Sequence, residues 1–129
     1  MKRLDIILLI LFGIIFWTAG TLWYRARGPI VFETTPLRFW INFTFTPILS
    51  AAVCLAILRW RQIPATNWST AALLIALPGM FGEAILLTHF ATWMPTMQPA
   101  SAGRFAAFLF AAYALVLTIA EAVTLRAAS

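Results

Sequence analysis

Glu83 is the one acidic residue that lies well inside a long apolar segment, about one helical turn from the segment's middle. A charged carboxylate at that depth of a membrane costs about 2.5–3.5 kcal/mol or more unless it is protonated or paired. Such a residue is a candidate for proton-linked chemistry. The structural alternative is an acid hydrogen-bonded to a polar residue of a neighbouring helix, or paired at the outer rim with Arg25 or Arg27. The polar candidates for this intramembrane site with Glu83 are Thr21, Asn42 and Thr46.

The remaining charged residues predict two further sites near the ends of the apolar segments. Glu121 is close in depth to Arg59 and Arg61, which predicts a cytoplasmic ion pair. At the other end, four arginines could bind an anionic lipid headgroup or a partner's acidic loop. The alternative there is a solvated loop. These four outer residues are Arg25, Arg27, Arg38 and Arg104.

Motifs of enzyme and cofactor sites are missing from the sequence. It has no glycine-rich phosphate loop, no HExxH and no CxxC, and no serine has an evident base and orienting acid. The single histidine, His89, cannot hold a haem between two imidazoles, and it could ligate a pigment only with help from another chain. We therefore expect no enzymatic activity, no cofactor and no metal.

The composition places these residues in a membrane protein. Of 129 residues, 63% are hydrophobic and 10% charged, with a mean hydropathy of +0.92. Soluble domains have about 45–50% apolar and about 25% charged residues, so a water-soluble monomer is excluded. The nine basic residues lie at the ends of apolar runs and form no patch. They fit lipid headgroups as partners and do not fit nucleic acid.

Four apolar segments are long enough to cross about 30 Å of hydrocarbon as helices. They cover residues 6–24, 37–58, 69–90 and 102–125, and the connections between them contain proline, with glycine or asparagine in the first two. No small-x-small cleavage site follows the first segment, which predicts a retained helix. The sequence therefore predicts an all-α, single-domain (1–129) integral membrane four-helix bundle.

The orientation follows from the basic residues. With the N-terminus inside, five basic residues are cytoplasmic and four are outside, and the early Lys2–Arg3 pair favours the same direction. We expect both termini to be cytoplasmic.

Small and polar residues at helical spacing predict which faces pack inward. In the fourth segment this face is Ala107, Ala111, Ala114, Thr118 and Glu121, and in the second it is Asn42, Thr46, Ser50 and Cys54. The faces either meet as a packed core or line a ligand cleft. Pro78 removes one backbone donor and should bend the third helix.

Three stretches carry a resemblance to a known family: residues 19–28 (AGTLWYRARG), Thr46–Pro47, and residues 77–83 (LPGMFGE). Together they resemble the bacterial domain-of-unknown-function family 5367, over nearly the whole chain and in the same four-helix order. The resemblance implies a small multi-pass protein of the bacterial inner membrane and supplies no activity.

Two functions from different classes remain. The small size and sparse chemistry favour a non-enzymatic accessory or assembly subunit that packs against other membrane proteins or against itself. The alternative is a homo-oligomeric, proton-linked carrier or channel for small solutes that uses Glu83. Binding of a lipid or an apolar ligand is a third possibility.

The predicted orientation can be tested with single cysteines at Gln62 and Pro99 in a Cys54→Ser background. An impermeant thiol reagent should label the cysteine at Pro99 from outside intact cells and should leave the one at Gln62 unlabelled. Equal labelling, or the opposite pattern, would reject the assigned orientation.

Overall fold

The computed structural model describes all 129 residues, and its regular elements are all helices. Four long helices are each long and apolar enough to cross a membrane. These are α1 (Arg3–Phe32), α2 (Pro36–Trp60), α3 (Trp68–Thr88) and α5 (Ala102–Ala128). Three short helices lie in the connections: η1 (Ala65–Asn67), α4 (Phe90–Trp93) and η2 (Pro99–Ser101). The predicted four-helix membrane architecture is confirmed.

Helix α1 ends later than the sequence predicted. It continues to Phe32 instead of ending at Tyr24, with Pro29 inside it. A proline in a helix leaves the carbonyl four residues earlier without a donor, which is why a break was expected here. In the fold, the hydroxyl of Thr96 donates to that carbonyl, on Arg25, at 2.6 Å. A side chain from the α4–η2 connection thus replaces the missing helical hydrogen bond.

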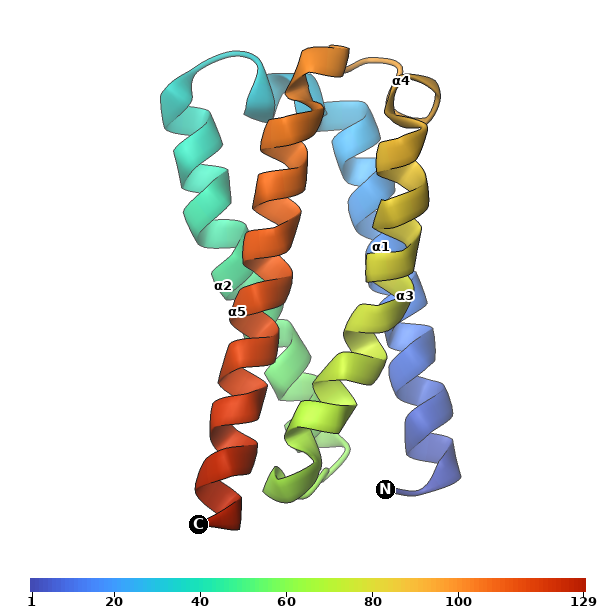
Figure 1. Ribbon diagram of the computed structural model, residues 1–129, viewed down its shortest axis with the longest axis vertical. Helices are drawn as coiled ribbons and strands as arrows, with labels where there is room; N and C mark the ends of the chain where they lie inside the picture. Colours follow the sequence, from blue (N-terminus) through green and yellow to red (C-terminus); the bar gives the residue numbers. More distant parts are fainter.

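The four long helices form a ring in the order α1, α3, α5, α2 (Figure 1). Helix α1 packs mainly on α3 and α2 mainly on α5, while the seam between α1 and α2 is looser. Helices α2 and α3 contain Pro47 and Pro78, and they converge in the half of the bundle that holds both termini (Figure 1). The N- and C-terminus lie at the same end, as an even number of crossings requires.

Two separate cores stabilise the bundle. The core nearer the termini contains small and aliphatic residues, among them Leu9, Leu58 and Ala71. The core at the other end is mainly aromatic, with Phe32, Phe105 and other rings packed edge to face. The bent helices are close together in the first core and farther apart in the second, where larger side chains fill the space.

The inward face predicted for the fourth helix is wrong. Ala107, Ala114, Thr118 and Glu121 are exposed and Ala111 is half-exposed, whereas the buried residues of α5 are Phe105, Phe108, Val116 and Ala120. Both sets recur at helical spacing on opposite faces, so periodicity alone could not choose between them. The large rings face inward because they fill the wide end of the bundle. In α2 the predicted stripe is only partly inward, with Cys54 buried, Asn42 and Thr46 half-buried, and Ser50 exposed.

The crossing of α1 on α3 requires glycine at position 13. A side chain there would collide with the backbone carbonyl of Ile75 and would lie 3.2 Å from the ring of Pro78. Gly20, two turns farther along α1, has open space around its Cα. Gly13 and Gly20 therefore form a matched pair for testing the crossing, because only the first of the two is crowded by α3.

Gly13→Ala should lower the free energy of unfolding in detergent by about 1–3 kcal/mol, because backbone atoms cannot move aside for the added methyl group. Gly20→Ala should cost nothing, because alanine favours the helix and meets no atom. Both values can be measured by thermal or denaturant unfolding of the purified protein. Equal stability of the two variants would contradict the close crossing.

Candidate functional site

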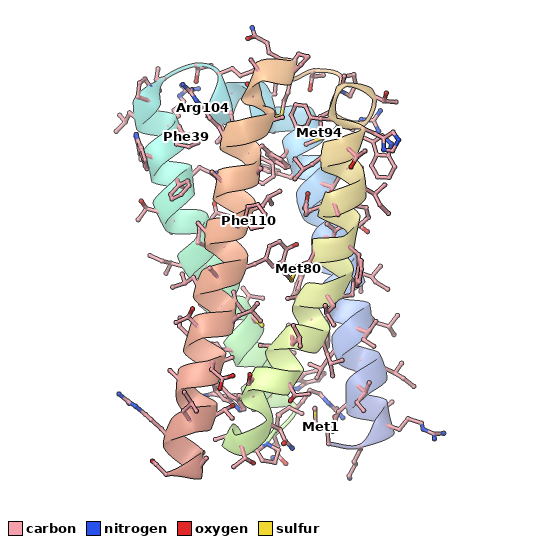
Figure 2. All side chains as sticks on the ribbon, in the orientation of Figure 1. Met1, Phe39, Met80, Met94, Arg104 and Phe110 are labelled. Carbon is pink, nitrogen blue, oxygen red and sulfur yellow. The ribbon has the colours of Figure 1, made fainter.

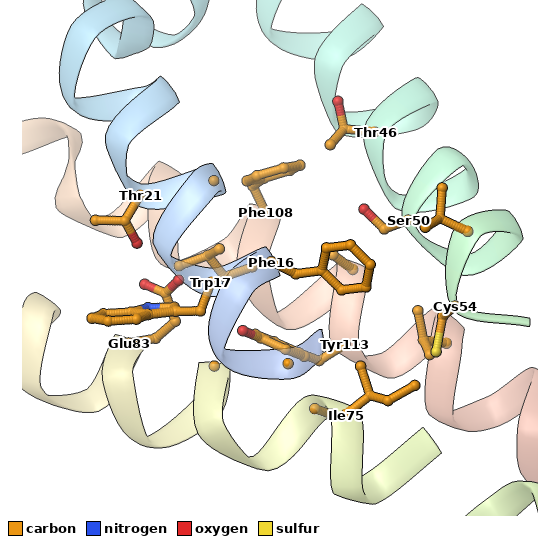
Figure 3. Close-up of a pocket in the computed structure, with 18 of the residues that line it drawn as sticks. Phe16, Trp17, Thr21, Thr46, Ser50, Cys54, Ile75, Glu83, Phe108 and Tyr113 are labelled. Carbon is orange, nitrogen blue, oxygen red and sulfur yellow. The ribbon is translucent and has the colours of Figure 1, made fainter. Parts of the chain in front are cut away.

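A cavity of about 320 Å³ lies between the two cores. All four long helices contribute to its lining, which is mostly hydrophobic. On one side the cavity is bordered by Cys54 and Val116, which belong to the core nearer the termini. On the other side it is bordered by Phe105 and Phe108, which belong to the mainly aromatic core. The cavity thus lies along the bundle between the two cores, with side chains of several helices directed into it (Figure 3).

Glu83 is the only acidic residue that lines the cavity. Its exposed fraction is 9%, and the oxygen Oε2 is buried without a hydrogen-bond partner. It lies on α3 slightly more than one turn after Pro78. None of the nine lysines and arginines lines this space, so no protein cation compensates the carboxylate.

The groups around Glu83 come from α1 and α5. The Trp17 indole lies beside the carboxyl, with Thr21 nearby on the same helix (Figure 3). Trp17 Nε1 and Thr21 Oγ1 are also buried without hydrogen-bond partners. Three polar groups at one end of the cavity are therefore unpaired, which is unusual in a protein interior.

Two glycines of α3 allow these aromatic side chains to approach so closely. A side chain at Gly82 would overlap the indole ring of Trp17, and one at Gly79 would overlap the hydroxyl of Tyr113. The glycines around Glu83 are thus required by close packing of rings on the α3 backbone. Neither Trp17 nor Tyr113 was recognised from the sequence as a site residue, although a polar tip on a buried aromatic ring commonly marks a hydrogen-bonding site.

The predicted polar set is brought only partly together. Thr21, Thr46 and Glu83 line the same cavity, but the hydrogen bonds expected for Glu83 are not formed. Instead, Asn42 Oδ1 accepts from the hydroxyls of Tyr24 and Thr46, each at 2.8 Å. The structural alternative of an acid bonded to Asn42, Thr46 or Thr21, or paired with Arg25 or Arg27, is therefore wrong. Tyr24 is buried and supplies the donor to Asn42.

The α1–α2 seam forms the exposed side of the cavity. Phe16, Leu49 and Val53 all line the cavity and have exposed fractions of 40%, 49% and 39%. Phe16 projects from α1 toward α2 (Figure 3). The exposed side of the cavity is therefore largely apolar, with Ser50 of α2 as an exposed polar residue.

The predicted cytoplasmic ion pair of Glu121 with Arg59 or Arg61 is not formed. Arg61 instead donates to Asp5 Oδ1 at 3.0 and 2.7 Å. Glu121 accepts from the hydroxyl of Ser69. The local contacts at this end decide the pairing: the start of α1 reaches Arg61 after α2, and the last turns of α5 reach the start of α3, where Ser69 also donates its backbone N–H to Thr124. The role of Asp5 was not predicted.

Contacts are formed by two of the four outer arginines, Arg27 and Arg104. Because α1 continues to Phe32, Arg25 and Arg27 lie on a helix, and Arg27 stacks over Trp23. Arg104 lies over the ring of Phe39 and donates to the carbonyl of Phe32 at 3.4 Å (Figure 2). Binding of lipid headgroups by this end stays a prediction.

The unpaired state of Glu83 leads to a test by leucine substitution. Glu83→Leu should leave the free energy of unfolding unchanged or raise it by up to about 1–3 kcal/mol, because it removes an unpaired polar group from an apolar interior. Asn42→Leu should lower it by about 1–3 kcal/mol, because the Tyr24 hydroxyl loses its acceptor. Detergent unfolding of both variants provides the measurement. A large loss of stability in Glu83→Leu would mean that the carboxyl has a structural partner.

Comparisons with known proteins agree with the resemblance noted in the sequence. The model of the family described as "Family of unknown function (DUF5367)" matches residues 31–126. The match includes Asn42, Thr46, Glu83 and Tyr113, while Trp17, Thr21 and the motif at residues 19–28 lie outside it. Neither the comparison with curated proteins nor the comparison with solved structures found a match. Because the match covers well over half of the sequence, the chain belongs to the DUF5367 family of unknown function.

Proposed function

We propose that the protein is a proton-linked carrier of small, largely apolar solutes, with Glu83 as the proton-binding group. The observation that carries the proposal is the buried, unpaired carboxyl of Glu83 in a cavity midway along the bundle. A carboxyl in a membrane interior is stable when it is protonated or when a bound group compensates its charge. Occupancy by a solute and by a proton can therefore be coupled through one side chain, and no chemical change of the solute is involved.

The size and depth of the cavity support this proposal. A volume of about 320 Å³ is enough for a small organic molecule. Carriers commonly bind their solutes near the middle of the bilayer, between two structural repeats. One chain has no evident internal repeat, so the proposal includes a homo-oligomer. We also propose that the protein lies in the bacterial inner membrane with both termini in the cytoplasm, as the sequence predicts.

An accessory or assembly subunit is the second candidate, and the observation that favours it is the outer face of α5. Ala107, Ala111, Ala114 and Thr118 point away from the core of the bundle, and small residues allow another helix to approach closely. Purification in mild detergent separates the candidates. Different subunits in fixed ratio would support the accessory function, whereas a discrete homodimer or homotetramer would support the carrier.

Proton flux in proteoliposomes tests the carrier directly. The solutes should be small apolar alcohols, amides and quaternary ammonium ions, because none of these carries a proton across lipid by itself. With a trapped pH dye, the wild-type protein should produce solute-dependent flux above that of empty vesicles. Glu83→Gln should abolish the flux, because the amide keeps the size and polarity of the side chain but cannot ionise.

Glu121→Gln is the matched control, because Glu121 is exposed on α5 and does not line the cavity. It should keep wild-type flux. Absence of flux from folded wild-type protein with every solute, or equal flux from Glu83→Gln, would reject the carrier.

A further inference from the structure

We infer that the cavity binds small organic monocations with an apolar body, such as quaternary ammonium ions, in exchange for the proton on Glu83. This inference rests on the proposed function and names the class of solute. It is drawn from the charge, the walls and the exposed side of the cavity.

The charge of the cavity calls for one positive group. Glu83 is the only carboxyl in the lining, and no lysine, arginine or histidine lines the space. The other ionisable residues in the lining are Tyr24 of α1, Cys54 of α2 and Tyr113 of α5, and none of these can carry a positive charge. An ionised Glu83 therefore needs its counter-charge from the ligand, and one monocation makes the site neutral.

The walls of the cavity are suited to an organic cation. Aromatic faces attract cations, and quaternary ammonium groups are commonly bound in aromatic cages. Six aromatic residues line the space: Phe16, Trp17, Tyr24, Phe105, Phe108 and Tyr113. A hydrated metal ion fits poorly, because no group of three or more metal-ligating side chains is present.

The unpaired donors beside Glu83 are suited to the state in which Glu83 is ionised and the cation is bound. Trp17 Nε1 and Thr21 Oγ1 lie near the carboxyl (Figure 3), and both can donate hydrogen bonds to carboxylate oxygens. Hydrogen bonds to the charged form favour ionisation. Hydrogen bonds from Trp17 and Thr21 would stabilise the carboxylate of Glu83 while the cation occupies the space beside the aromatic rings.

The exposed side of the cavity selects a ligand that dissolves in the membrane. The two cores close the cavity toward both ends of the bundle, and the α1–α2 seam exposes Phe16, Leu49 and Val53. A ligand that arrives from lipid along this seam must have an apolar body. Binding then breaks the O–H bond of protonated Glu83 and the net charge of the site stays zero. The proton leaves to the solution through the same exposed side, where the hydroxyls of Thr46 and Ser50 also line the cavity.

Direct binding to the purified full-length chain in detergent tests the inference. The probe is benzyltrimethylammonium, measured by equilibrium dialysis against protein-free micelles. Wild-type protein should bind it and should release protons in weakly buffered solution at a pH where Glu83 is protonated. Glu83→Gln should bind it about tenfold or more weakly, whereas Glu121→Gln should bind within about twofold of wild type.

The neutral isostere neopentylbenzene, which has carbon in place of the cationic nitrogen, provides the control for shape. Three results would each overturn the inference: Glu83→Gln binds the cation as tightly as wild type does, neopentylbenzene competes as well as the unlabelled cation does, or wild type binds the cation without releasing protons. If Glu83→Gln does not fold, Glu83→Asp should retain binding and proton release, and loss of both in a folded Asp variant would also overturn it. Proton flux with alcohols or amides but not with quaternary ammonium ions would reject the inferred cation as the solute and would leave the proposed carrier function standing. Binding of the cation without any proton flux would reject only the carrier function.

Discussion

The close packing of α1 on α3 is the contact on which the rest of the structure depends. Gly13 brings the two backbones together at Ile75 and Pro78, and Gly82 allows the indole of Trp17 to lie on α3 one turn farther along. In lipid there is little hydrophobic force between helices, so such van der Waals contact between backbones is a main source of association. The same contact fixes Trp17 and Thr21 beside Glu83.

The bends of α2 and α3 determine where the bundle is open. Pro47 and Pro78 interrupt the hydrogen-bond ladders of their helices, and the helices converge in the half that holds the termini. Small residues fill that half and aromatic rings fill the other. The cavity lies between the two, with residues of both cores in its lining. An unpaired carboxyl is placed in this space, where it gains no stability from the fold. Proteins often keep such unfavourable groups where function requires them.

The polar residues of the bundle thus have two different roles. The hydroxyls of Tyr24 and Thr46 both donate to Asn42 Oδ1, and the bond from Tyr24 joins α1 to α2 at the edge of the cavity. Asp5 and Arg61 do the same at the end near the termini. Glu83, Trp17 and Thr21 each retain an unpaired buried atom and form no side-chain hydrogen bond that joins two helices, whereas Asn42 accepts two hydrogen bonds through Oδ1 although its Nδ2 is also buried without a partner.

The sequence by itself determined the membrane class, the four helices, the bend at Pro78 and the depth of Glu83, because hydropathy, length and proline act locally along the chain. Three helices end within a few residues of their predicted limits. The tertiary structure alone decided the length of α1, because Thr96 of a distant connection satisfies the carbonyl freed by Pro29. It also decided the inward face of α5, where two faces had the same periodicity, and the partner of Arg61, which is Asp5 and not the predicted Glu121. These choices depend on which helix lies beside which, and hydropathy and spacing within one helix carry no information about its neighbours.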